Sequence, residues 1–178
     1  MGKIGDGGGA MTTDSSMGSA KVVVSRELDV PPEMAWKAWS EPEQVRQWWG
    51  PTGFSCPRAD MDFRVGGTSL VTMQAPAEYG GFQMHNRWTY TGIVEPSRIE
   101  FVSTFADDTG AMVAPAEVGI ESGVPNEVPH LVEFEPLPEG RTRVTVTEFG
   151  YTTEQARDLS QGGQEQVMDK MQALYRRT

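Results

Sequence analysis

The chain has 178 residues, and its 15 basic and 25 acidic side chains give a formal net charge of -10. This length fits one domain with a core that needs no metal ion or disulfide for stability. The charge, without any cluster of Lys and Arg, argues against nucleic-acid binding, because phosphate recognition requires a clustered basic surface.

The single cysteine, Cys56, excludes an internal disulfide framework and fits a reducing compartment. No apolar run approaches the roughly 20 residues of a membrane span, and no apolar signal-peptide centre is present. We therefore expect a soluble cytoplasmic protein with no membrane span.

The first segment, 1–20, is rich in Gly, Ser and Thr and poor in large apolar side chains. Ordering such a segment costs conformational entropy with little burial in return, so we expect a flexible tail followed by a single domain over 21–178. The β-branched run within 21–29 predicts the first strand.

Two short helices are predicted next. The first covers 30–40, where apolar residues fall at helical spacing after a pair of prolines. The second begins with Ser40 as N-cap and Glu43 three residues later, the pattern of a capping box. Gly50 and Pro51 end it.

From Phe54 onward, apolar and polar residues alternate in runs separated by short turns. This alternation predicts strands, and strands joined by short turns pair with their neighbours in an antiparallel meander. The six expected strands lie at 54–65, 68–75, 84–96, 97–105, 129–137 and 141–151.

The connection at 106–129 is long and shows no clear period. Connections of this length are usually functional loops or disordered insertions. Acidic residues and glycine alternate here with Met and Val, which suggests a loop that covers an apolar space. A mobile insertion is an equally good interpretation of the sequence.

One long helix is predicted over 152–177, with a capping box of Thr152 and Gln155. Gly162 and Gly163 weaken its middle by about 1 kcal/mol each, which predicts a bend or close packing there. Its apolar stripe consists of Val167, Met168, Met171, Leu174 and Tyr175.

Four stretches carry a family resemblance: "VPPEMAWKAWSEPEQVRQWWGP", "DFRVGGTSLVTM", "VEPSRIEFV" and "VEFEPLPEGRTRVTVTEFG". From Lys21 to the end, the chain resembles the START and pollen-allergen superfamily. Within it, the chain is most similar to the C-terminal domain of the activator of the heat-shock protein ninety ATPase and to small stand-alone bacterial proteins. The family usually has Gly-Trp in the final helix, where this chain has Gly163 and Gln164.

The resemblance implies an α+β helix-grip fold. It consists of a strand, two short helices, a six-stranded antiparallel meander and a long C-terminal helix across the curved sheet, with an apolar cavity between helix and sheet. One of the adjacent Trp48 and Trp49 would then pack under the short helices, and the other would close the cavity mouth. The alternative is that both rings are ordinary core and rim packing.

A cavity of this kind favours an apolar or amphipathic ligand, which is lipid-like, aromatic or polyketide-like, and no cofactor. Methionines suit such a wall, because their flexible thioether chains repack around varied shapes, although they also fill ordinary cores. The expected ligand-binding residues are Trp48, Met73, Met84, Trp88, Tyr90, Phe101, Val132, Phe134, Met168 and Met171.

Two other functions stay open. One is a stress-related interaction module with a chaperone or another protein partner, as the resemblance implies. The other is a cyclase or hydrolase in which His85, Tyr90 or Glu148 acts as acid or base. Neither His85 nor His130 stands in a metal-ligand spacing, so no metal site and no catalytic motif is expected. The sequence fits a monomer or a homodimer.

Overall fold

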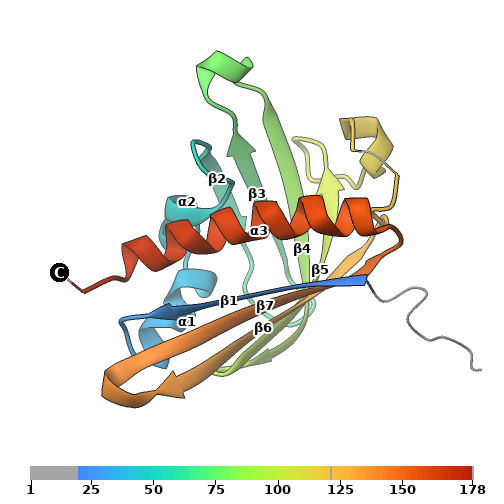
Figure 1. The fold of residues 1–178 in the computed structure, drawn as a ribbon. Helices are drawn as coiled ribbons and strands as arrows, with labels where there is room; N and C mark the ends of the chain where they lie inside the picture. The colour runs from blue at the N-terminus through green and yellow to red at the C-terminus, as the bar shows by residue number, and fades with distance from the viewer. Residues whose placement is uncertain (1–19, 121, 178) are drawn as a thin grey trace, which may run out of the picture.

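The computed structural model describes residues 20–120 and 122–177, so nearly all of the expected N-terminal tail lies outside the described residues. Within these residues, seven antiparallel strands form one sheet in the order β1-β7-β6-β5-β4-β3-β2. The sheet bends around the long helix α3, which crosses its inner face (Figure 1). No helix among the described residues is long and apolar enough to cross a membrane.

The elements follow the predicted order. Their bounds are β1 (Ala20–Leu28), α1 (Pro32–Ser40), α2 (Pro42–Trp48), β2 (Ser55–Met61), β3 (Thr68–Gln74), η1 (Ala77–Tyr79), β4 (Gln83–Val94), β5 (Arg98–Ala106), η2 (Pro115–Val118), β6 (Val128–Leu137), η3 (Pro138–Gly140), β7 (Arg141–Tyr151) and α3 (Glu154–Leu174).

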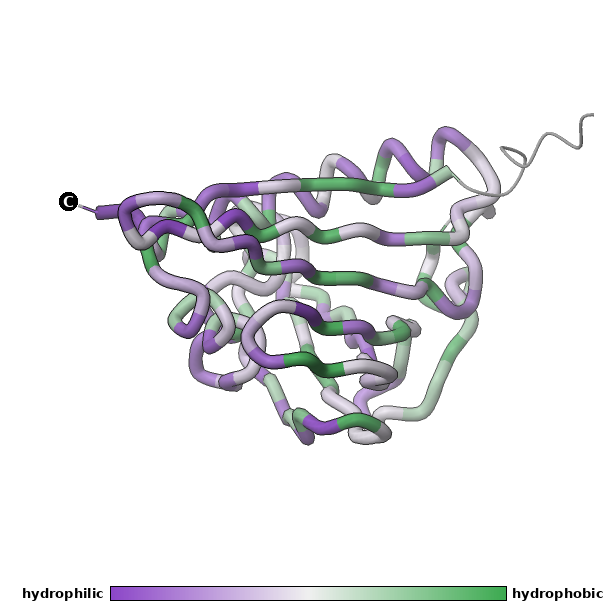
Figure 2. The backbone as a smooth tube through the Cα atoms, turned by 90° about the horizontal axis from the view of Figure 1, so that it is seen from below, coloured by the Kyte–Doolittle hydropathy of each residue, from purple (hydrophilic) through white to green (hydrophobic). Residues whose placement is uncertain are grey.

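The helix-grip architecture is confirmed. Strands β2 to β7 form the expected six-stranded meander, and β1 adds to it by pairing with β7. Green and purple stretches follow one another along the strands in Figure 2, as expected for strands with one buried and one solvated face. The η3 turn places Glu139 at a positive φ of 64° and aligns β6 with β7.

The expected cap of the second helix is wrong by one residue. Helix α2 starts from Glu41, whose backbone is extended, and neither Ser40 nor any other side chain caps it. Pro42 explains this start, because a proline forces the residue before it out of the helical region. For the same reason, α1 begins at Pro32, after an extended Pro31.

The cap of α3 also differs from the prediction. Thr153, not Thr152, is the N-cap, and its hydroxyl accepts a hydrogen bond from the Ala156 N–H at 3.1 Å. The helix runs without interruption through Gly162 and Gly163, and nothing lies within 4 Å of where a Cβ would stand on either. The expectation of close packing at this pair was therefore wrong.

The buried core occupies the half of the inner face that α1, α2 and the C-terminal half of α3 cover. Trp39 lies at its centre, with ring centroids 4.6 Å from Trp48 and 6.1 Å from Trp88. From the expected stripe of α3, Val167, Met168 and Met171 are buried, whereas Leu174 is exposed.

Helix α3 also covers the free edge of β1. Its Gln161 side chain accepts from Val23 N at 3.3 Å and donates to Val23 O at 3.1 Å. Farther along, Arg157 donates to Lys21 O and Gln172 donates to Glu27 O. These side chains satisfy backbone groups that would otherwise form an open strand edge.

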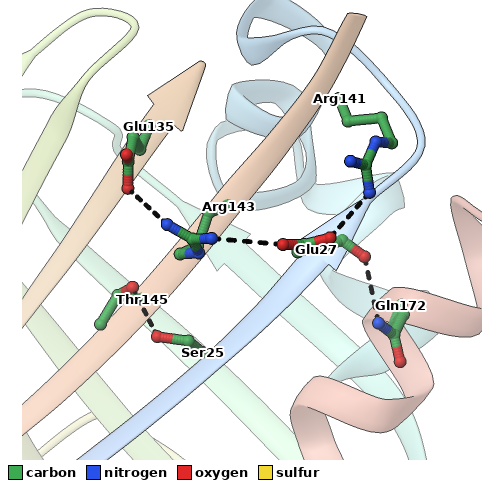
Figure 3. Close-up of polar contacts among 7 residues, drawn as sticks. All are labelled: Ser25, Glu27, Glu135, Arg141, Arg143, Thr145 and Gln172. Atoms are coloured by element: carbon green, nitrogen blue, oxygen red, sulfur yellow. Dashed lines mark hydrogen bonds and ion pairs between the residues drawn. The ribbon is translucent and has the colours of Figure 1, made fainter. Parts of the chain in front are cut away.

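The outer face of the sheet is polar where β1, β7 and β6 meet. Arg143 lies between Glu27 and Glu135 at 3.3 and 3.1 Å, and Arg141 binds Glu27 at 2.7 Å (Figure 3). Such partly exposed pairs contribute little stability individually. They mark this face as solvated and leave the inner face for a binding site.

Candidate ligand-binding cavity

A cavity of about 500 Å³ lies between the sheet, the N-terminal half of α3 and the β5–β6 loop, whose described residues are 107–120 and 122–127. In Figure 1 the yellow segment around η2 lies near the N-terminal end of α3, opposite the end that carries α1 and α2. The cavity therefore occupies the half of the inner face that the aromatic core leaves unfilled.

The sheet wall of the cavity is partly apolar and partly polar. Met73 of β3 and Met84 of β4 lie opposite each other, and Asn86 lies two residues after Met84 on the same face of β4. Ser103 and Thr104 of β5 are buried, and the Thr104 hydroxyl has no hydrogen-bond partner among the described residues.

The opposite wall comes from the β5–β6 loop and α3. Ile120 and Val124 of the loop line the cavity together with Leu159 of α3. The loop is held against the helix start, because Thr152 N donates to Gly123 O at 2.9 Å. The segment therefore borders an apolar space, as one of the two interpretations of its sequence expected.

The two adjacent tryptophans have different roles. Trp48 is fully buried, and its indole N–H donates to Ala38 O at 2.9 Å. Trp49 is half-buried, lines the cavity and meets Trp88 edge to face, with centroids 5.0 Å apart. Its own indole N–H has no hydrogen-bond partner among the described residues.

A row of side chains crosses the inner face where the core gives way to the cavity. The strand register aligns Tyr90, Phe101, His130 and Glu148 on four successive strands. The His130 ring stacks on Phe101 at 4.7 Å, and its Nε2 lies 2.8 Å from Glu148 Oε1. His130 and Glu148 also line the cavity.

The hydrogen bonds of His130 define the protons of this pair. Its Nδ1 lies 2.8 Å from Val128 O, and a carbonyl oxygen only accepts, so Nδ1 carries a proton. The contact between Nε2 and Glu148 then requires one further proton, on either the ring or the carboxyl group. In both cases the pair as a whole is electrically neutral.

Glu148 also has an unused acceptor. Its Oε2 is buried and has no hydrogen-bond partner among the described residues. Nearby, burial raises the pKa of Tyr151 well above its usual value, and both the charge of Glu148 and a hydrogen-bonding contact with its carboxyl group raise it further, although a hydrogen bond with Ser160 opposes this. Tyr151, which lines the cavity, therefore stays protonated and neutral.

The structure separates the ten expected ligand-binding residues. Met73 and Met84 line the cavity. The other eight lie in the packed core and do not line it: Trp48, Trp88, Tyr90, Phe101, Val132, Phe134, Met168 and Met171. Core and cavity walls use the same large apolar side chains, so the sequence pattern alone did not distinguish them.

The three residues suggested as acid or base also lie apart. Glu148 borders the cavity, but His85 contacts Thr72 and Tyr90 contacts Ser69, each at 2.7 Å, and neither lines the cavity. Within the described part of the chain, no group of three or more His, Cys, Asp or Glu side chains could hold a metal ion.

Sequence reasoning missed the pairing of His130 with Glu148 and the position of Trp49 in the wall. A signal for the pairing was present, because the two residues are equally far from Glu139, the centre of the predicted hairpin. Residues equidistant from a hairpin centre face each other across its strands, as His130 and Glu148 do.

Comparison with known proteins agrees with this fold. The family model described as "Activator of Hsp90 ATPase homolog 1-like protein" matches residues 29–176. A search of curated proteins finds no match.

Several solved bacterial structures are similar along most of their length. A protein from Mycobacterium smegmatis is 23% identical, with a TM-score of 0.69 over 89% of this chain and 92% of the other. A solution structure from Arthrobacter aurescens is 27% identical, with a TM-score of 0.68 over 88% and 86%. A protein described as AHSA1 from Silicibacter pomeroyi is 21% identical, with a TM-score of 0.68 over 86% and 96%. With a family match across nearly all of the described residues, the chain belongs to the family of activator of Hsp90 ATPase homolog 1-like proteins.

Proposed function

We propose that the protein binds a largely apolar small molecule in the cavity between the sheet, α3 and the β5–β6 loop. The observation that carries this proposal is the cavity itself, with its volume of about 500 Å³. Pockets for small ligands commonly span about 300–1,000 Å³ and combine apolar walls with a few placed polar groups.

The composition of the wall supports this function. Met73, Met84 and Leu159 present flexible or branched apolar chains, and Trp49 adds an aromatic surface. Flexible thioether chains adapt to varied ligand shapes. The neutral pair of His130 and Glu148 supplies the polar groups at the border with the core.

The test is a titration with N-phenyl-1-naphthylamine, a neutral apolar dye that fluoresces strongly when it leaves water. We expect saturable binding of one dye per chain. Ser103→Phe places a large ring in the cavity from the middle of β5 and is expected to abolish this binding. Ser25→Phe makes the same change on the outer face, where Ser25 is exposed beside Thr145 (Figure 3), and serves as the matched control.

Two results would contradict the proposal. One is the absence of saturable dye binding to the folded wild-type protein. The other is equal dye binding by the Ser25→Phe and Ser103→Phe variants, with both shown by circular dichroism to be folded, because the dye would then bind elsewhere.

The family description supports a second candidate, a chaperone ATPase activator-like interaction module. An ATPase assay with a bacterial chaperone of the Hsp90 class tests it. Stimulation that depends on the concentration of this protein would support the module, and an unchanged rate would remove it.

A further inference from the structure

We infer that the ligand of this cavity is electrically neutral and donates a hydrogen bond, from a hydroxyl or amide N–H group, to the free carboxyl oxygen of Glu148. This inference rests on the proposed function and specifies its ligand class. It follows from the charges in the cavity wall and from Glu148 Oε2, the one buried carboxyl oxygen that makes no hydrogen bond of normal geometry with the described residues.

The first argument concerns charge. Apart from His130, the only titratable carboxylate or basic side chain that lines the cavity is Glu148, and no Lys or Arg among the described residues lines it. A ligand carboxylate or phosphate would therefore be buried without a cationic partner, which is strongly unfavourable.

A ligand cation meets the same difficulty. His130 and Glu148 share their protons so that the pair is neutral, as their 2.8 Å contact and the Val128 carbonyl require. An ammonium group placed beside the pair would have no net counter-charge. The wall therefore favours a neutral ligand over either charged form.

The second argument concerns hydrogen bonding. Glu148 is 7% exposed, and although the Tyr151 hydroxyl contacts its carboxyl group, Oε2 makes no hydrogen bond of normal geometry with any described residue. Whether the shared proton lies on His130 Nε2 or on Glu148 Oε1, Oε2 keeps lone pairs and no proton, so it remains an acceptor. Buried acceptors are nearly always satisfied in folded proteins, and a donor on the ligand would satisfy this one.

The strand register indicates where the hydroxyl or amide N–H group of the ligand would lie in the cavity. The row that contains His130 and Glu148 borders the packed core, whereas Met73 and Met84 line the wall formed by β3 and β4. A ligand bound through Glu148 therefore has its polar end at the core side of the cavity. Its apolar body extends toward the methionines and the β5–β6 loop.

The test uses four biphenyls that differ at one position: 4-hydroxybiphenyl, 4-methylbiphenyl, biphenyl-4-carboxylate and 4-(aminomethyl)biphenyl. Their affinities are measured at pH 7 by displacement of N-phenyl-1-naphthylamine. We expect the hydroxyl compound to bind about tenfold more tightly than its methyl isostere, an effect within the usual range for one hydrogen bond. Both charged compounds should bind more weakly than the hydroxyl compound.

A variant of Glu148 tests whether the preference for the hydroxyl compound over the methyl compound depends on its carboxyl group. Glu148→Met removes the acceptor and should bring the hydroxyl and methyl compounds within about twofold of each other, the range expected without the hydrogen bond. Glu135→Met, on the outer face, is the matched control and should keep the wild-type preference (Figure 3).

The outcomes separate this inference from the proposed function. If neither the dye nor any biphenyl binds, the proposed function itself fails. If the dye and the biphenyls bind, but the methyl compound or either charged compound binds the wild-type protein as tightly as the hydroxyl compound, the inference is overturned and the proposed function stands. This comparison needs only the wild-type protein, so it holds even where Glu148→Met does not fold.

Discussion

Single side chains in this protein are placed by the face of the strand on which they lie. Tyr90 illustrates this, because its ring packs edge to face on Phe63 at 4.9 Å and its hydroxyl pairs with Ser69 at 2.7 Å, both on the inner face. Burial raises the pKa of Tyr90 to about 12, with a further increase from Asp62, although the Ser69 hydrogen bond lowers it. A group held neutral in this way makes folding sensitive to alkaline pH.

The sign of this effect follows from the shift. In the unfolded chain Tyr90 ionises near 10.0, whereas in the folded protein it keeps its proton to about 12. The contribution is therefore fully present below pH 10 and is lost as the pH rises toward 12, by about 1.4 kcal/mol at pH 11. Urea unfolding at pH 8 and pH 11 measures this loss of stability. Between these two pH values, the free energy of unfolding of Tyr90→Phe should fall less than that of the wild-type protein, by about the same amount.

The control for this prediction is Tyr79→Phe, because Tyr79 is 68% exposed. This variant should retain the wild-type loss of stability between the two pH values. If Tyr90→Phe lost as much stability as the wild-type protein, the assignment of the alkaline loss to Tyr90 would be wrong.

Among the elements, α3 has two roles that lie on different sides of the helix. One side buries Val167, Met168 and Met171 against the core. Another side presents Gln161 and Gln172 to the free edge of β1. The helix therefore takes the place of a further strand at this edge, because its long polar side chains form hydrogen bonds with β1 backbone groups that a neighbouring strand would otherwise pair.

Removing one of these side chains tests this role. Gln161→Ala should expose the Val23 amide, raise its hydrogen-exchange rate about tenfold and lower the free energy of unfolding by about 1 kcal/mol. Gln166→Ala is a matched control on the same helix, because Gln166 accepts from Thr52 N at 3.1 Å, in the loop after α2, and not from a β1 backbone group. Equal protection of Val23 in both variants would refute the edge-capping role.

For the whole molecule, the cavity depends on contact between two segments distant in sequence. Gly123 of the β5–β6 loop lies so close to the start of α3 that an added Cβ would collide with the Thr153 hydroxyl and the Ala156 methyl group. Its φ of 107° is itself unfavourable for other residues. A glycine at this position therefore allows the loop to form the cavity wall.

Substitution at this glycine should affect both stability and binding. Gly123→Ala is expected to cost about 3 kcal/mol or more, because a collision adds to the roughly 1–2 kcal/mol of a positive φ, and to weaken dye binding. Gly80→Ala isolates the backbone term, because Gly80 has φ 89° and nothing lies within 4 Å of its Cβ position. Equal losses in thermal denaturation and unchanged dye binding would show that the close contact is unimportant.

Much of this fold was predictable because its signals are local. Alternation in strands such as 141–151, the proline-led starts of α1 and α2 and the stripe on α3 each involve residues a few positions apart. The errors at Ser40 and Thr152 also have local causes. Each cap is one residue later than predicted, and at α2 the backbone restriction before Pro42 outweighed a good capping side chain.

The sequence by itself determined the order of the elements, the antiparallel meander and the hairpin centre that places His130 opposite Glu148. Only the tertiary structure decided that Trp48 fills the core while Trp49 lines a cavity, and that Phe101 is packed while Ser103, two residues later, is not. Periodicity shows which face of an element is buried. Whether that face meets other side chains or an unfilled space depends on the packing of segments far apart in the chain.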